Sequence, residues 1–75
     1  MRTMFIKISN FEDITRMVHL ASSTVEGRVI FKRDIYVVDG KSLMGVLSLA
    51  LSGGVYVEYP ETATQYEEYL LQFKG

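Results

Sequence analysis

Cysteine is absent from this chain of 75 residues, and proline occurs only once. Without thiols the chain forms neither a disulfide framework nor a thiolate metal site, and it suits a reducing cytoplasm. The longest apolar-rich run, Leu43 to Leu51, is far shorter than the roughly 20 residues that span a bilayer. The start, MRTMFIKISN, lacks the continuous apolar segment of a secretory signal. We therefore expect one soluble cytoplasmic domain, residues 1–75, with no membrane association, cofactor or metal.

An excess of charge of one sign is also missing. Eight Lys and Arg residues stand against nine Asp and Glu residues, a formal net charge of −1. The basic residues are spread along the chain, and Lys32-Arg33 is their only adjacent pair. Because nucleic-acid-binding domains normally carry a clustered basic stripe, we expect no nucleic-acid partner. A content of 48% hydrophobic residues argues against a disordered chain.

No arrangement of residues typical of an enzyme is present. The chain has one histidine, His19, and lacks a Ser/His/Asp arrangement, a metal-spaced cluster and a phosphate-cradling glycine loop. His19 falls in the middle of a predicted helix, on its polar face and one turn from Arg16, where a solvated histidine is the expected state. A mid-helix position also lacks the free backbone N–H groups of a helix start. We expect a protein without enzymatic activity.

Periodic patterns predict the elements of the first half. Residues Thr3 to Ile8 alternate like a strand with one apolar face. Asn10 is placed to cap a helix, and the run RVIFKRDIYVV predicts a hairpin around a polar turn at residues 32–34. The apolar stripe of the predicted helix recurs at i, i+3, i+4 and i+7: Ile14, Met17, Val18 and Ala21.

The second half predicts helix, strand and helix. Residues 42–52 have helical spacing and are followed by two glycines that can end a helix. Val55 to Tyr59 alternates as a strand, which Pro60 ends. Thr64 and Glu67 form a capping box that opens a last helix. The expected core residues of the two helices are Val46, Leu49 and Ala50, and then Tyr66, Tyr69, Leu70 and Phe73.

The resulting order, β-α-β-β-α-β-α, predicts an α+β fold with helices packed on one face of an antiparallel sheet. Its first six elements are also the order of a ferredoxin-like split βαβ domain. The periodic patterns alone leave both architectures open.

The segment KSLMGVLSL, Lys41 to Leu49, resembles the regulatory-serine segment of HPr, the histidine-containing phosphocarrier family of the bacterial sugar phosphotransferase system. Most of its positions are identical to those of Gram-positive members, and the others are conservative apolar changes. The resemblance continues through the following strand and helix and, more weakly, back through the hairpin. It implies an HPr-like open-faced sandwich, in which a four-stranded antiparallel sheet is covered on one face by three helices.

The same resemblance shows which site is altered. HPr carries its phosphoryl group on a histidine at the front of the first helix, in a motif that also contains an arginine. The matching stretch here is ISNFEDIT, which places Asn10 at the histidine position and Glu12 at the arginine position. An amide cannot replace the imidazole nucleophile, and Glu12 with Asp13 would repel an incoming phosphate. The chain is thus similar to catabolite-repression HPr, a relative that lacks the phosphorylatable histidine.

Ser42 is the residue to which the resemblance gives a role. A serine at a helix N-cap stabilises any helix by about 1 kcal/mol. In HPr relatives this serine is the target of an ATP-dependent kinase, and the phospho-form binds a transcription regulator. By resemblance, Leu43, Met44 and Leu47 correspond to an exposed apolar patch that contacts partners. The competing interpretation is that all three residues belong to the core.

These observations favour a non-enzymatic HPr-like regulatory or adaptor protein controlled by phosphorylation at Ser42. The expected partners are proteins, namely a serine kinase and a transcription regulator or phosphotransferase-system protein. The chain itself is expected to be a monomer or a weak homodimer. Two alternatives stay open: a phosphocarrier that uses a non-standard site, and a ferredoxin-like small-molecule-binding regulatory domain.

Overall fold

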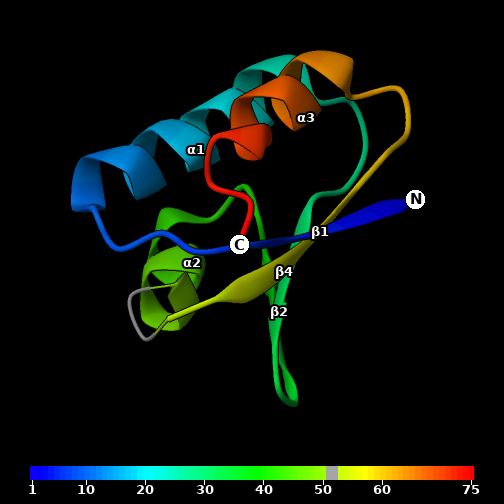
Figure 1. Ribbon diagram of the computed structural model, residues 1–75. Coiled ribbons are helices and arrows are strands. Elements are labelled where there is room, and N and C mark those ends of the chain that lie inside the picture. The colour runs from blue at the N-terminus through cyan, green and yellow to red at the C-terminus, as the bar shows by residue number, and fades with distance from the viewer. Residues whose placement is uncertain (51–52) are drawn as a thin grey trace.

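The computed structural model describes residues 1–50 and 53–75, and its elements follow the predicted order β-α-β-β-α-β-α (Figure 1). The expected helix end at residues 51–52 lies outside the described residues. The strands are β1 (Arg2–Ile6), β2 (Ile30–Arg33), β3 (Tyr36–Asp39) and β4 (Val55–Tyr59). The helices are α1 (Phe11–Thr24), α2 (Leu43–Ala50) and α3 (Thr64–Leu71).

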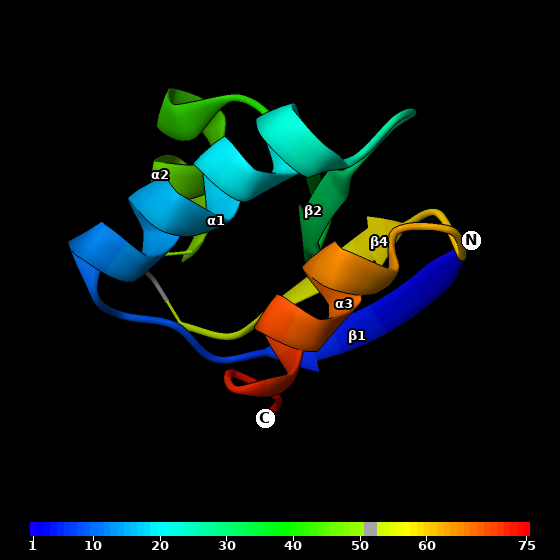
Figure 2. The ribbon, with the colours of Figure 1, turned by 90° about the horizontal axis from the view of Figure 1, so that it is seen from above.

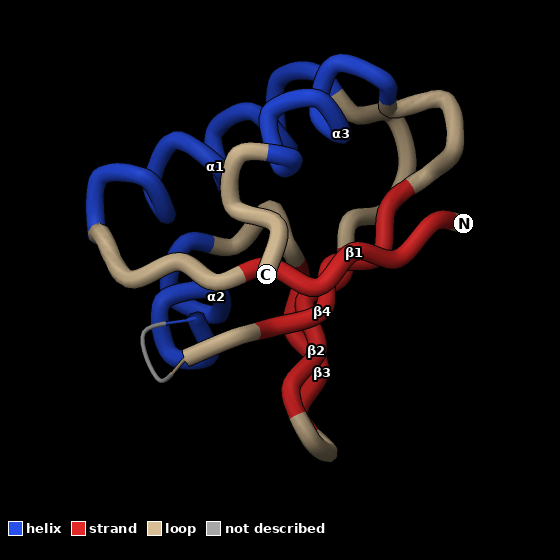
Figure 3. Tube along the Cα trace, viewed as in Figure 1, coloured by secondary structure: helices blue, strands red, loops and turns tan. Residues whose placement is uncertain are grey.

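The four strands form one antiparallel sheet in the order β1-β4-β2-β3, which confirms the predicted α+β class. The central strands are β4 and β2, while β3 is an edge strand joined to β2 by a tight turn (Figure 3). Met4 of β1 and Phe31 of β2 both lie opposite Val57 of β4. Because directly opposite residues point to the same face of a sheet, this register places three buried side chains in one row.

The helices enclose a single core against one face of this sheet. Figure 2 looks down on α1 and α3, with the strands beneath them. Alternate strand residues meet the apolar stripe of each helix, as the two periodic patterns predict. The core includes Met4, Ile6, Ile14, Met17, Val18, Ala21, Phe31, Val46, Leu49, Ala50, Val55, Val57, Tyr59, Tyr66 and Leu70.

The other face of the sheet is open. Tyr56 is about half exposed there and packs against the ring of Phe5, with ring centroids 4.9 Å apart. Lys32 and Glu58 form an ion pair across β2 and β4, with a distance of 2.6 Å from Nζ to Oε2. Along the strands, apolar side chains that face the core therefore alternate with polar and aromatic side chains that face solvent, as expected for a sheet covered on one side.

The hairpin turn lies later than residues 32–34, where the sequence placed it. Lys32 and Arg33 belong to β2 and pair with Val37 and Tyr36. The two-residue turn is Asp34-Ile35, and Asp34 has a φ of 56°. Two-residue hairpin turns need a left-handed backbone to match the twist of the strands, and Asp tolerates that conformation better than most residues. Polarity alone therefore misplaced the turn.

Two further expectations at element ends are wrong in detail. The first strand ends at Ile6 rather than Ile8, because the next residue, Lys7, donates its backbone N–H to the carbonyl of Phe73 at 2.9 Å. The capping box at the start of α3 does not form. Thr64 is already helical, Ala63 holds the N-cap position, and no side chain caps the helix. The Glu67 carboxylate instead contacts two other elements, described below.

Candidate functional site

The backbone before α2 is held by a tight network around Asp39. The Asp39 side chain accepts a hydrogen bond from the backbone N–H of Lys41 at 2.9 Å, and its carbonyl accepts from that of Ser42 at 3.0 Å. Gly40 donates its N–H to the carbonyl of Val29 at 2.7 Å. A Cβ at Gly40 would lie 2.5 Å from Val29 Cγ1, so only glycine fits this approach. Ser42 is therefore presented from a well-defined turn.

Ser42 occupies the N-cap position of α2, as the sequence predicted. Its Oγ accepts a hydrogen bond from the N–H of Gly45 at 3.4 Å, and its carbonyl accepts from Val46 at 3.0 Å. The side-chain contact is longer than the usual 2.9–3.0 Å, so the cap is weak. Ser42 is also exposed, which leaves its hydroxyl accessible.

Lys41 joins the start of α2 to the end of α1. Its Nζ donates a hydrogen bond to the carbonyl of Val25 at 2.8 Å, and Val25 is the C-cap residue of α1. The lysine is half-buried. This contact brings the side chain of Lys41 to the C-terminal end of α1, the end opposite Asn10.

The apolar patch expected over Leu43, Met44 and Leu47 is smaller than the sequence suggested. Met44 is 82% exposed, but Leu43 and Leu47 are half-buried and pack against the core. One turn separates the two leucines, so they share the flank of α2 between its buried stripe and solvent. The helical period gives the direction of a side chain on α2, but it does not show whether a side chain at the edge of the buried stripe is half-buried or exposed. Met44 is the residue of the three that stands fully outward.

Asn10 and Glu12, which the resemblance aligned with the carrier site, lie at the N-terminal end of α1. Asn10 caps this helix, because its Oδ1 accepts hydrogen bonds from the N–H groups of Glu12 at 2.8 Å and Asp13 at 3.3 Å. Glu12 is exposed, and the helix has no basic residue in its last turn. The side chain of Lys41, the residue before Ser42, reaches the other end of this helix at Val25. A cap amide and two carboxylates occupy the helix start.

His19 lies exposed on α1, as predicted. It borders a shallow hollow of about 450 Å³ together with Thr15 and Arg16. Phe11, at the other end of this hollow, is 57% exposed. The sequence analysis did not single out Phe11. It precedes Ile14 by three residues and Val18 by seven, so helical spacing alone would group it with the buried stripe, and only the structure shows that it is exposed.

A polar cluster ties β1, β4 and α3 together. Arg2 Nη1 contacts both carboxylate oxygens of Glu67, at 3.0 and 2.9 Å, and Tyr59 Oη donates to Glu67 Oε2 at 2.7 Å. The hydrogen bonds from Tyr59 and Arg2 lower the pKa of the Glu67 carboxyl. Burial, together with the bond to Glu67, raises the pKa of Tyr59 to about 12. At neutral pH both shifts favour an ionised Glu67 carboxylate and a protonated Tyr59 phenol, the two states that form this hydrogen bond. The cluster therefore has a structural role.

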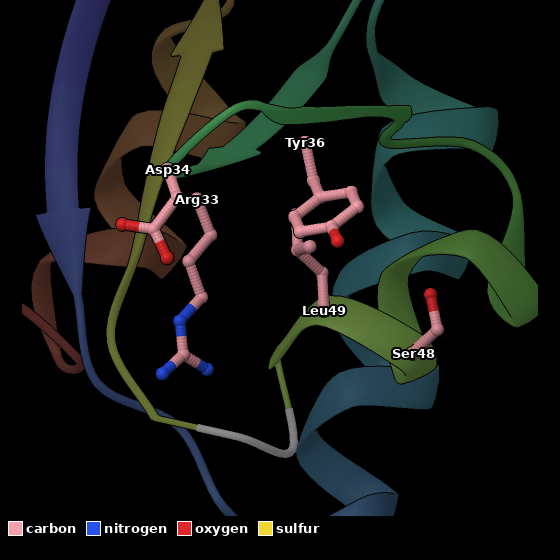
Figure 4. Close-up of a pocket in the computed structure, with 5 residues that line it drawn as sticks. All are labelled: Arg33, Asp34, Tyr36, Ser48 and Leu49. Carbon is pink, nitrogen blue, oxygen red and sulfur yellow. The ribbon is translucent and has the colours of Figure 1, made fainter.

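A second candidate site, the Arg33 pocket, was not foreseen from the sequence. It is a hollow of about 350 Å³ between the hairpin turn and the end of α2 (Figure 4). Arg33 was assigned to the turn, but the alternation from Phe31 places it on the inner face of β2. That alternation is the signal that could have identified it. The lining residues are Arg33, Asp34, Tyr36, Ser48 and Leu49.

The described residues contain no helix long and apolar enough to cross a membrane. Among them there is also no group of three or more His, Cys, Asp or Glu residues that could hold a metal ion. Comparison of the chain with protein-family models, with curated proteins and with solved structures finds no match.

Proposed function

We propose that this chain is a non-enzymatic, HPr-like regulatory or adaptor protein that acts through the start of α2. The observation that carries the proposal is the pairing of an exposed N-cap serine, Ser42, with a neighbouring exposed methionine, Met44. A serine kinase modifies Ser42, and the modified helix start then binds a regulator or a phosphotransferase-system protein.

The helix start is suited to a phosphoryl group. Phosphorylation adds a charge of about −1.5 to −2, and the positive end of a helix dipole favours a negative charge there. The existing cap bond from Gly45 is long at 3.4 Å, so little is lost when the serine oxygen is esterified. Asp39 supplies one nearby negative charge, and Lys41 supplies a positive one. Modification therefore changes the charge of the surface more than its shape.

Met44 supports the adaptor role of the same surface. An unbranched, polarizable side chain adapts to partner surfaces of different shape. Because Leu43 and Leu47 are partly buried against the core, the apolar surface that a partner can contact is small and centred on Met44. A small contact next to a switchable charge suits a regulated, reversible association better than a permanent one.

The altered start of α1 argues against a histidine phosphocarrier. The Asn10 amide has no nucleophilic nitrogen, and its oxygen is already used by the N–H groups of Glu12 and Asp13. Two carboxylates in the first turn repel an incoming phosphoryl group. His19 lies on the exposed side of the helix and has no surrounding helix-start donors.

The first test is phosphorylation by a serine kinase that modifies Gram-positive HPr, with ATP and intact-mass detection. We expect a gain of one phosphoryl group in the wild type and in Ser48→Ala, and none in Ser42→Ala. Met44→Gln should slow the reaction several-fold, whereas Leu71→Gln, which changes an exposed leucine on α3, should leave the rate unchanged. An unmodified wild type, or an equally modified Ser42→Ala, contradicts the proposal.

The phosphocarrier alternative makes a different prediction. Incubation with phosphoenolpyruvate and the first enzyme of the phosphotransferase system would then give an acid-labile adduct. We expect none. An adduct lost in His19→Ala but retained in Ser42→Ala would favour this alternative over the regulatory role.

A further inference from the structure

Arg33 carries a positive charge that the described part of the chain does not neutralise. Its Nη1 is buried and has no hydrogen-bond partner among residues 1–50 and 53–75. The two ion pairs among the described residues use Arg2 and Lys32 as their cations. Arg33 as a whole is half-buried, but a buried guanidinium nitrogen normally has a partner, because leaving it unpaired is costly. An unmatched arginine inside a pocket is therefore a candidate for binding an anion.

The pocket around Arg33 has a polar side and an apolar side. Figure 4 shows the guanidinium on one side and the ring of Tyr36 above Leu49 on the other. Gly53, with a φ of 134°, flanks the guanidinium, and a Cβ built on it would lie 3.6 Å from Nη2. The close backbone limits the freedom of the arginine side chain. The volume of about 350 Å³ is at the lower end of the range for small-molecule sites.

We infer that this pocket binds a small organic monoanion, with a carboxylate on Arg33 and an apolar or aromatic body against Tyr36 and Leu49. The planar guanidinium matches the two oxygens of a carboxylate, and the ring of Tyr36 is the flat apolar surface that such a body requires. Ser48 already donates its hydroxyl to the carbonyl of Gly45 at 2.7 Å, so it offers an acceptor.

The charge of the pocket selects a monoanion over phosphate. Asp34 lines the same pocket and is exposed. Its carboxylate forms no ion pair with Arg33 among the described residues, but it repels negative charge on a ligand, and this repulsion is larger for a dianion than for a monoanion. The inference goes beyond the proposed function, because the pocket lies at the other end of α2 from Ser42.

The test is an NMR titration of the full chain with benzoate, with benzamide as the neutral ligand of the same shape and inorganic phosphate as the dianion. We expect saturable amide shifts at residues 33–36 and 48–49 with benzoate, at millimolar concentrations. Benzamide should bind at least ten-fold more weakly, and phosphate more weakly than benzoate. No saturable shift with benzoate, equal binding of benzamide, or preferred binding of phosphate overturns the inference.

Variants assign the binding to the named residues. Arg33→Met should abolish benzoate binding, and Arg28→Met, which removes an exposed arginine elsewhere, should retain it. Tyr36→Phe keeps the ring and should retain binding, whereas Tyr36→Ala should weaken it at least five-fold. Amide spectra and the Tm of each variant confirm that it is folded, and Arg33→Met should not lower the Tm, because it removes an unpaired charge. Unchanged binding by folded Arg33→Met overturns the assignment.

Discussion

Tyr59 and Tyr66 pack edge to face in the core, with ring centroids 6.4 Å apart, yet their hydroxyl groups are in opposite situations. Tyr59 Oη donates to Glu67 at 2.7 Å. Tyr66 Oη is buried and finds no hydrogen-bond partner within the described residues, and burial raises the pKa of this phenol. Both rings contribute apolar area, but only one hydroxyl recovers the cost of leaving water.

This difference predicts opposite effects of the same substitution. Tyr59→Phe should lower the free energy of unfolding by about 1 kcal/mol, the typical value of a hydrogen bond. Tyr66→Phe removes an unsatisfied group and should be neutral or stabilising. Urea unfolding of both variants at neutral pH measures the two values. A larger loss for Tyr66→Phe than for Tyr59→Phe would show that the Tyr66 hydroxyl has a partner in solution.

At the scale of elements, the three helices begin with caps of decreasing strength. Asn10 accepts two backbone N–H groups at the start of α1, and Ser42 accepts one, at a longer distance, at the start of α2. Ala63 provides no side-chain cap for α3. Because the cap bond of Ser42 is long, α2 depends little on this side chain, whose hydroxyl is exposed. Modification of Ser42 is therefore compatible with the fold.

The caps give a prediction about helix stability. Asn10→Ala should cost about 1 kcal/mol, the usual loss for a good N-cap. Ser42→Ala should cost clearly less, because its single bond is 3.4 Å long. Chemical denaturation of both variants, with Ser22→Ala on the exposed side of α1 as a neutral control, measures the difference. A Ser42→Ala loss equal to that of Asn10→Ala would contradict the weak cap.

For the whole molecule, the cluster of Arg2, Tyr59 and Glu67 is the polar link among β1, β4 and α3. The first of these elements, β1, is distant in the chain from β4 and α3, which follow one another. Glu67 has a pKa below its ordinary value of 4.5, mainly through the hydrogen bonds from Tyr59 and Arg2. Its contribution to stability is therefore fully present above the pKa of the unfolded chain. It is lost as the pH falls through the lower pKa of the folded chain.

The cluster predicts the acid dependence of stability. The stability difference between the wild type and Glu67→Gln should be larger at pH 7 than at pH 3, because protonation removes the carboxylate from the wild type. Glu26→Gln, which changes an exposed glutamate outside the cluster, should show no such change with pH. Urea unfolding at the two pH values provides the comparison. Parallel pH profiles for the wild type and Glu67→Gln would disprove a role of this ionisation.

Patterns local in the sequence accounted for most of the fold. The apolar stripe of α1 is buried, as expected, and so are the alternate residues of β4, namely Val55, Val57 and Tyr59. These patterns are reliable because periods of 3.6 and 2 residues follow from backbone geometry alone. The cap by Asn10 was also predictable, because the side chain bonds to its own next residues. Fold class and element order therefore needed no tertiary information.

The candidate sites were less predictable. Ser42 and Met44 could be named from the sequence, but the half-burial of Leu43 and Leu47 depends on how α2 lies against the core. The capping box failed because Arg2, far away in the chain, and Tyr59 supply partners for Glu67. A local pattern contains no information about such competing partners.

The sequence by itself determined the elements, their order and their buried faces, because these follow from periodicity and local capping. Only the tertiary structure decided what the polar side chains contact. It placed Arg33, whose Nη1 has no hydrogen-bond partner in the described part of the chain, in a pocket with Tyr36 and Leu49. It also brought the side chain of Lys41, next to Ser42, to the end of α1 opposite Asn10. The physical reason is that apolar burial follows a pattern within each element, whereas the pairing of a charge depends on which distant elements the sheet order brings together.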